Sequence, residues 1–230
     1  MKKLFVANYK MNGNKNFYQK VNKVLNKLKI ADTVILCPPF VYMPFFKIKN
    51  KNLFLGSQDI SGDENKKSTG QISAKMLNEF ALKYAIIGHS ERREIGETDV
   101  QVARKVKKAI DNQIIPIVCV GEKNKSSKID VVKNQVEIAL SNIESGEVIF
   151  AYEPIWAIGS GEVPTIKKID SVINLIKETA KNKGFDVKVL YGGSVNEINH
   201  QELKTSLADG FLMGGVSLKV DEFISIVKEV

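Results

Sequence analysis

The sequence predicts an α/β fold, a closed (β/α)8 barrel with eight parallel strands, formed by a single domain over residues 1–230. Eight short runs rich in Val, Ile, Leu and Phe recur along the chain, and stretches with helical periodicity lie between them. The runs follow one another at about thirty residues, the length of one βαβ unit. No linker, low-complexity segment or shift in composition divides the chain, which favours one domain.

The eight apolar runs are predicted to be strands. They are continuous rather than alternating, as expected for strands that are buried on both faces of a parallel sheet. In chain order they are KLFVANY (3–9), TVILCPP (33–39), LFLGSQ (53–58), YAIIGHS (84–90), IIPIVCVG (114–121), EVIFAYEP (147–154), VKVLYGG (187–193) and GFLMGG (210–215).

Four longer stretches between these runs have the period of an amphipathic helix. They are NFYQKVNKVLNKLK (16–29), DVQVARKVKKAIDNQ (99–113), DVVKNQVEIALSNI (130–143) and IKKIDSVINLIKETAKNKG (166–184). In the second stretch Val102, Val106 and Ile110 fall on one stripe. The fourth ends in Gly184, a residue suited to a helix C-terminus.

Eight such units fit either a closed barrel or an open, doubly wound sheet. An open sheet would favour a G-x-G-x-x-G turn near the start, but the first run is followed by NYKMNGN. The glycine pairs instead come late, after the seventh and eighth runs, where many barrels place a phosphate site. The barrel is therefore the favoured architecture.

The composition is that of an ordinary soluble protein, with 43% hydrophobic and 26% charged residues. No apolar run reaches the length of about 18 residues that a membrane span needs. The N-terminal apolar run is broken by Asn8 and Lys10 and has no small-residue cleavage site, so we expect a strand and not a signal peptide. Cys37 and Cys119 lie in strand-like runs without CxxC spacing, which predicts reduced, buried thiols in a cytoplasmic protein.

The net charge of +8 comes almost entirely from lysines. These lysines are spread along presumed helix surfaces and are interleaved with Asp and Glu, without a basic cluster that also contains aromatic residues. We therefore expect a solvated surface that weakly steers an anionic substrate, and neither a nucleic-acid partner nor a membrane partner.

In a barrel, the chemistry collects at the carboxyl ends of the strands. Lys10 alone would be a solvated lysine, and His89 alone would be a structural histidine; the second histidine, His200, is expected at the surface. Glu153 is harder to dismiss, because a carboxylate at the end of a buried strand must be hydrated, paired or used. The polar and glycine residues at these ends are Asn8, Lys10, Gln58, Asp59, His89, Ser90, Glu91, Glu122, Glu153, Gly192, Gly193, Ser194, Gly214 and Gly215.

Together these residues suit proton transfer beside a carbonyl group in a small phosphorylated substrate. The two glycine turns would offer backbone N–H groups to a phosphate, Glu153 would take a proton from carbon, and His89 with Lys10 would polarise the carbonyl oxygen. This chemistry favours an isomerase or an aldolase-like lyase. A Schiff-base aldolase is disfavoured because Lys188, the only lysine candidate, lies at the start of its strand. A non-catalytic barrel that binds a phosphate ligand or nucleic acid, and a different phosphosugar isomerase, stay open as alternatives.

Five motifs in order resemble the triosephosphate isomerase family, over essentially the whole chain. They are ANYKMNG, IIGHSERR, AYEPIWAIGSG, LYGGSV and DGFLMGG. The resemblance implies a TIM barrel that interconverts dihydroxyacetone phosphate and glyceraldehyde 3-phosphate through an enediolate, without a cofactor or metal. It further implies a homodimer that acts in glycolysis, gluconeogenesis and the pentose shunt, in the cytoplasm.

The resemblance also implies roles for single residues. Glu153 is the base that shuttles the proton between two carbons, and His89 is the neutral electrophile at the oxygens. Lys10 supplies positive charge to the enediolate and the phosphate, Asn8 helps to fix the substrate, and Glu91 pairs with Lys10. Segment 154–161, which follows the base, is the lid that closes over the substrate.

Further residues have binding or supporting roles by the same resemblance. Ser90 lines the site, and Cys119 packs beneath the base as a structural residue. Thr69, in the segment GSQDISGDENKKSTGQIS (56–73), reaches the site of a neighbouring subunit. The phosphate is held by the backbone N–H groups of Gly159, Ser194, Gly214 and Gly215.

The chain also departs from the family pattern. It is shorter than the usual length of about 250 residues, and much of the difference falls between the first and fourth strands. Asp59 and Gln71 stand where the family more often has Asn and Glu. Glu162–Val163–Pro164 replaces the usual residues after the lid, and a proline there fixes φ and is expected to stiffen the closing motion.

Overall fold

Eight strands form a closed ring in the computed structural model, which describes residues 2–63, 67–126, 129–158 and 162–228. Each strand pairs in parallel with the next along the chain, and β8 pairs with β1, so the predicted closed (β/α)8 barrel is confirmed. Every strand lies within one of the eight apolar runs. The strands are β1 (Leu4–Asn8), β2 (Thr33–Cys37), β3 (Leu53–Ser57), β4 (Tyr84–Ile87), β5 (Ile115–Val120), β6 (Ile149–Tyr152), β7 (Lys188–Tyr191) and β8 (Gly210–Met213).

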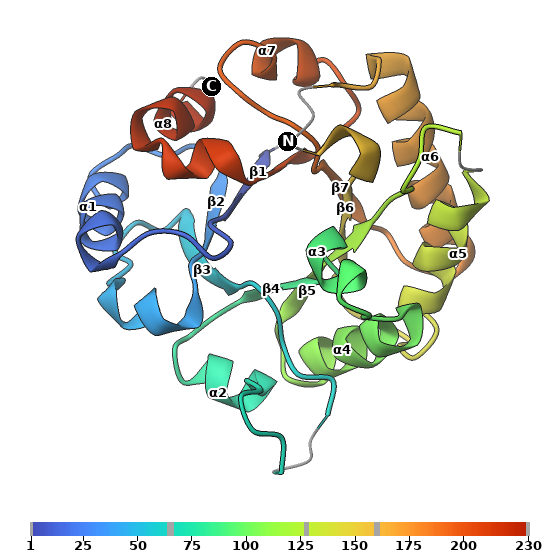
Figure 1. Ribbon diagram of the computed structural model, residues 1–230, viewed down its shortest axis with the longest axis horizontal. Coiled ribbons are helices and arrows are strands. Elements are labelled where there is room, and N and C mark those ends of the chain that lie inside the picture. The colour runs from blue at the N-terminus through green and yellow to red at the C-terminus, as the bar shows by residue number, and fades with distance from the viewer. Residues whose placement is uncertain (1, 64–66, 127–128, 159–161, 229–230) are drawn as a thin grey trace.

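The longer helices surround this ring on its outside, while the short α3 lies over its rim (Figure 1). Each of the four amphipathic stretches corresponds to a helix that ends two to four residues before the end of the stretch, and α1 begins one residue before its stretch. The α-helices are α1 (Lys15–Leu25), α2 (Ala74–Asn78), α3 (Ser90–Glu94), α4 (Asp99–Asp111), α5 (Asp130–Ala139), α6 (Ile166–Asn182), α7 (His200–Leu203) and α8 (Val220–Lys228). Three short 3-10 helices are η1 (Phe40–Phe45), η2 (Ile155–Ala157) and η3 (Gly215–Leu218).

The helical layer is thin between β2 and β4, where the chain is short. The connection from β2 to β3 holds only η1, which contains Pro44, and a proline inside a helix removes a backbone donor and clashes with the preceding turn. Aromatic rings fill this side of the barrel instead: Tyr18 of α1 stacks on Tyr42 at 4.8 Å between ring centroids and contacts Phe46 at 5.7 Å.

Two layers of apolar side chains account for the continuous strand runs. Alternate strand residues point into the ring, while the others point outward and pack against the helices. The fully or almost fully buried residues of the inner layer are Leu4, Val6, Ile35, Cys37, Ile86, Ile117, Cys119, Ile149, Ala151, Leu190 and Leu212.

Both cysteines are free and buried, as predicted. Within the described ranges, no helix combines the length and the apolar character that a membrane crossing requires.

Closure of the ring depends on a glycine at the start of β8. Gly210 has φ 155°, and a Cβ atom on it would lie 1.8 Å from the carbonyl oxygen of Leu4. We expect Gly210→Ala to lower the free energy of unfolding by about 3 kcal/mol, because the two backbones would have to separate where β1 meets β8. Urea denaturation measures this change. Gly184→Ala is the control, since Gly184 also has a positive φ but no atom within 4 Å of an added Cβ; equal losses in the two variants would contradict the prediction.

Candidate active site

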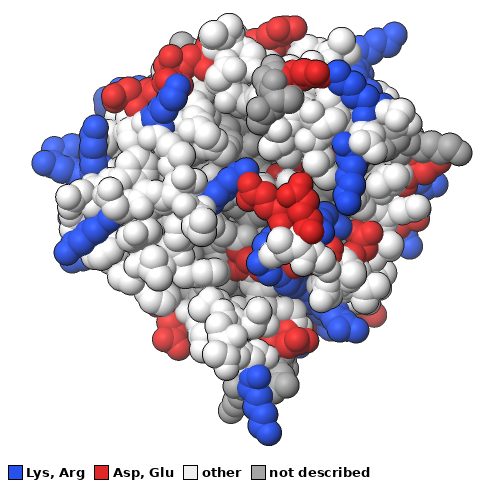
Figure 2. All heavy atoms as spheres, viewed as in Figure 1, with Lys and Arg blue, Asp and Glu red and all other residues white. Residues whose placement is uncertain are grey.

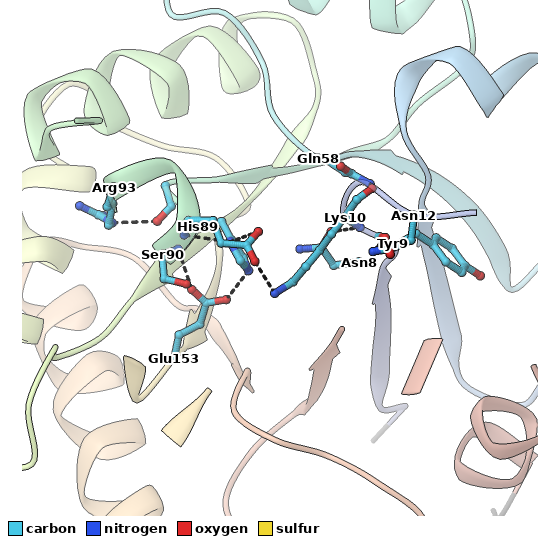
Figure 3. A network of polar contacts seen from close by, with 11 residues as sticks. Asn8, Tyr9, Lys10, Asn12, Gln58, His89, Ser90, Arg93 and Glu153 are labelled. Carbon is cyan, nitrogen blue, oxygen red and sulfur yellow. Dashed lines mark hydrogen bonds and ion pairs between the residues drawn. The ribbon is translucent and has the colours of Figure 1, made fainter. Parts of the chain in front are cut away.

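A buried carboxylate and an imidazole face each other at the carboxyl ends of β4 and β6 (Figure 3). Glu153, only 2% exposed, directly follows β6, and His89 precedes α3. His89 Nε2 lies 3.2 Å from Glu153 Oε1, and the backbone N–H of Ser90 donates to Glu153 Oε2 at 3.1 Å. Both oxygens of the carboxylate therefore have a partner, as a buried charge requires.

The first turn of α3 selects the tautomer of His89. The backbone N–H of Glu91 donates to His89 Nδ1 at 3.3 Å, so Nδ1 is an acceptor and carries no hydrogen. Glu91 Oε2 lies 3.6 Å from the same nitrogen, beyond hydrogen-bond distance, and its carboxylate pairs with Lys10 instead. The imidazole is therefore neutral, with the hydrogen on Nε2, the nitrogen that faces Glu153.

Lys10 is held at three points after the end of β1. Its Nζ lies 2.8 Å from Glu91 Oε1, and its backbone N–H donates to Asn8 Oδ1 at 3.1 Å. Its carbonyl oxygen accepts from Gln58 Nε2 at 2.8 Å (Figure 3). The backbone of Lys10 has φ 50°, which a residue with a side chain rarely adopts, so these contacts stabilise a strained conformation.

The glycine turns after β7 and β8 complete a cavity of about 260 Å³. Lys10, His89 and Glu153 line it together with residues of the two turns and of the segment after β6. The turn and segment residues are Ile158, Gly192, Gly193, Ser194, Val195, Gly214, Gly215 and Val216. The cavity thus brings a carboxylate, a neutral imidazole and an ammonium group beside exposed backbone of the glycine turns.

A family model described as triosephosphate isomerase matches residues 3–230. The chain belongs to the triosephosphate isomerase family. The resemblance that the five motifs indicated is confirmed, and the protein is an enzyme of the isomerase class.

Individual triosephosphate isomerases are similar over almost the full length of the chain. The enzyme of Mycoplasma mobile is 38% identical over 243 aligned positions, which cover 99% of each chain. The enzyme of Alkaliphilus metalliredigens is 37% identical over 244 positions and 98% of each chain, and that of Thermoanaerobacter pseudethanolicus is 40% identical over 224 positions and 90% of each chain.

Two residues to which the sequence assigned no role make several hydrogen bonds around the site. Gln58 Nε2 donates to the carbonyl oxygens of Lys10 and Cys37, at 2.8 and 2.9 Å, and so ties the ends of three strands together. Glu122 Oε1 accepts from the Tyr152 hydroxyl at 2.9 Å and from Trp156 Nε1 at 3.0 Å. Glu122 therefore holds Tyr152 and Trp156, which precede and follow Glu153 in the chain. The only signal for either residue was its place at the end of a buried strand.

Several sequence-predicted residues lie outside this cluster or outside the described ranges. Thr69 is exposed on the loop between β3 and α2, which projects from the barrel in Figure 1. Gly159 falls in the range 159–161, which lies outside the described residues. Lys188 begins β7 and lies near Glu147 at 3.7 Å, at the opposite end of the strand from the cavity.

The prediction that His200 is at the surface is wrong. His200 is 4% exposed, and its Nδ1 lies 2.9 Å from the carbonyl oxygen of Glu197. The polar stretch around it turns back on itself at the start of α7, so the imidazole points inward while its polar neighbours face solvent.

Cys119 of β5 lies in the inner layer, close to Glu153. Burial, and secondly the charge of Glu153, raise the pKa of the Cys119 thiol well above its usual value. Burial also raises the pKa of Cys37. Both thiols are therefore protonated and unreactive at neutral pH, which suits packing and not nucleophilic chemistry.

We expect both cysteines to resist alkylation at alkaline pH. At pH 9 an unperturbed cysteine is largely thiolate, the form that reacts with iodoacetamide, whereas a thiol of raised pKa stays protonated until the pH is higher still. Labelling of the folded protein at pH 9 should be about 100-fold slower than labelling in urea. Mass spectrometry of the two cysteine peptides measures this, and equal rates in the folded and unfolded states would contradict it.

Proposed function

We propose that this protein interconverts dihydroxyacetone phosphate and D-glyceraldehyde 3-phosphate without a cofactor, through an enediolate. The observation that carries the proposal is the contact of 3.2 Å between Glu153 and a neutral His89 in a cavity that also contains Lys10 and the two glycine turns. The names of the relatives support the choice of substrate. The proposed setting of the reaction is glycolysis, gluconeogenesis and the pentose shunt, in the cytoplasm.

Glu153 is proposed as the base that moves a proton between the two substrate carbons. Its carboxylate is buried and lines the cavity, so it lies within reach of the carbon atoms of a substrate bound there. The Nε2–H of His89 faces Glu153 in the absence of substrate, and we propose that in the complex it donates instead to the carbonyl oxygen that becomes the enediolate oxygen. A glutamate base with a neutral histidine is the arrangement established for triosephosphate isomerases.

Lys10 and Asn8 are proposed to bind the substrate from the side of β1. Lys10 Nζ supplies positive charge to the enediolate and phosphate oxygens, while Glu91 orients it. A Cβ atom on Gly214 would lie 3.4 Å from Lys10 Cε, so the lysine lies directly over the turn that follows β8. The ammonium group and the backbone of this turn can therefore act on one phosphate.

The phosphate is proposed to bind backbone N–H groups of Ser194, Gly214 and Gly215, joined by Gly159 when the lid closes. The Ser194 hydroxyl donates to the carbonyl oxygen of Ala157 at 3.0 Å, so the phosphate turn and the start of the lid already touch. This contact supports a coupling between phosphate binding and lid position. An enediolate exposed to water would lose its phosphate, which gives the lid its purpose.

A nucleic-acid-binding barrel is the main alternative of another class. Figure 2 shows the face of the barrel that is seen in Figure 1, on which Lys and Arg side chains are dispersed and interleaved with Asp and Glu. No continuous basic surface covers the face, which argues against a nucleic-acid partner.

Glu153→Gln tests the proposed base. Turnover of glyceraldehyde 3-phosphate in a coupled assay should fall by about 10²- to 10⁴-fold, since the amide cannot accept the proton. The amide keeps the size of the side chain, so thermal unfolding should change little. Unchanged turnover would contradict the role of Glu153, and equal or faster turnover of larger sugar phosphates by the unmodified protein would favour a different isomerase.

We also propose a homodimer, in which the loop that carries Thr69 enters the site region of a second copy. Apolar side chains are exposed beside Lys10 and α3: Met11 is 95% exposed and Ile95 is 74% exposed. A second cavity of about 260 Å³ lies beside Lys10 and Glu91, between them and residues 58–61 and 70–72. A loop from a second copy would bury both the cavity and the apolar side chains.

The dimer can be tested by light scattering, with an expected mass of about 51 kDa, twice the 25.6 kDa of one chain. Met11→Asp should shift the protein to monomers at micromolar concentration and reduce turnover. Ile198→Asp is the matched control, because Ile198 is 94% exposed but lies beside α7, across the ring from α2. A monomeric mass for the unmodified protein, or equal effects of the two changes, would contradict the proposal.

A further inference from the structure

Two pairs of adjacent residues lie side by side at the ends of β3 and β4. Gln58 and Asp59 follow β3, and Glu91 and Arg92 lie in α3, just after β4. The first member of each pair reaches Lys10. Gln58 Nε2 donates to the Lys10 carbonyl oxygen at 2.8 Å, and Glu91 Oε1 lies 2.8 Å from Lys10 Nζ.

The second members of the pairs are joined to each other. Arg92 Nη2 lies 3.2 Å from Asp59 Oδ2, and Lys105 Nζ of α4 lies 2.6 Å from Asp59 Oδ1. The Lys105 side chain is only 8% exposed and also pairs with Glu97. Each oxygen of the Asp59 carboxylate therefore has its own cation, one from α3 and one from α4.

This ion-pair junction occurs where the barrel has few backbone contacts. β3 and β4 share only two paired positions, Gly56↔Tyr84 and Ser57↔Ala85, whereas β1 and β2 share five, and only β7 and β8 share fewer. Side chains therefore add to the few backbone contacts that set the spacing of these two strand ends. That spacing sets the distance between Gln58 and Glu91, which hold the carbonyl end and the ammonium end of the same residue.

We propose that Asp59 is a positioning residue for Lys10. By joining Arg92 to Lys105 it fixes the separation of Gln58 and Glu91, and so keeps Lys10 in its strained conformation with Nζ directed to the cavity. The proposal rests on the proposed function, in which Lys10 acts on the substrate. Among the ion pairs of the described residues, Asp59 is the only carboxylate that contacts Arg92. Gln71, which lines the second cavity together with Asp59 and Arg92, is neutral.

Asp59→Asn is the test variant, because the amide keeps the shape of the side chain and removes only its charge. We expect it to fold: Lys105 keeps Glu97 as a partner, and the Arg92 side chain, 41% exposed, reaches water. kcat/KM for glyceraldehyde 3-phosphate should fall about 10-fold, since small displacements of a positioned group can cost up to about 100-fold. A crystal structure of the variant should show the contact between Lys10 Nζ and Glu91 Oε1 lengthened or broken.

Asp32→Asn is the matched control. Asp32 is 3% exposed, and it accepts from the Lys3 backbone N–H at 2.8 Å. It precedes β2 and therefore lies at the opposite end of the barrel. Loss of its charge should lower the thermal midpoint of unfolding and leave kcat/KM within about 2-fold. An equal loss of kcat/KM in both variants would show a general effect of stability and overturn the proposal.

The decisive measurement is a double-mutant cycle with Lys10→Met. If Asp59 acts through Lys10, Asp59→Asn should change kcat/KM by less than about 2-fold in the Lys10→Met background. The role of Asp59 would be overturned if Asp59→Asn lowered kcat/KM equally in both backgrounds, or if Lys10 kept its position in the Asp59→Asn structure. It would also be overturned if the kcat/KM of Asp59→Asn recovered at higher protein concentration. Full activity of Asp59→Asn would overturn it while the proposed function stands, whereas an inactive unmodified protein would overturn the proposed function itself.

Discussion

Every group of the candidate active site is attached to a ring of eight hydrogen-bonded strands, which closes where Leu4 of β1 lies beside Gly210 of β8. Because all the strands are parallel, their carboxyl ends lie on one rim of the ring. Lys10, His89 and Glu153 are far apart in the sequence, and this rim is the reason that they meet. The ring leaves no free sheet edge, so the strands cannot slide without breaking the closure.

Within this frame, the first turn of α3 organises the chemistry. Its backbone supplies the Ser90 N–H to Glu153 and the Glu91 N–H to His89, and the Glu91 side chain pairs with Lys10. One helical turn thus contacts the proposed base Glu153, the proposed electrophile His89 and the ammonium group of Lys10. The N–H groups of the first turn can serve in this way because they have no partners inside the helix. A shift of α3 would therefore disturb all three groups together.

The sequence predicted the parts of the structure that depend on local pattern, and missed those that depend on contacts across the barrel. Strand positions followed from continuous apolar runs, and Glu153 stood out as a carboxylate at the end of one. Gln58 and Glu122 were recognised only as strand-end residues, because their importance lies in partners at least twenty residues away. His200 was misplaced because local polarity does not show which way a short turn faces.

The segment after Glu153 is held unequally at its two ends. At its start, Trp156 Nε1 donates to the buried Glu122 carboxylate, and a hydrogen bond to a charged group contributes about 1.5–3 kcal/mol. The backbone N–H of Ile155 also donates to the backbone carbonyl oxygen of Glu122. At its far end, Glu162 pairs with Lys125, which also lies over the Trp156 ring at 4.8 Å. Both members of that ion pair are more than half exposed, so it contributes at most about 1 kcal/mol. The contacts of the start of this segment therefore converge on Glu122, and Pro164 restricts the backbone at its far end, just after Glu162.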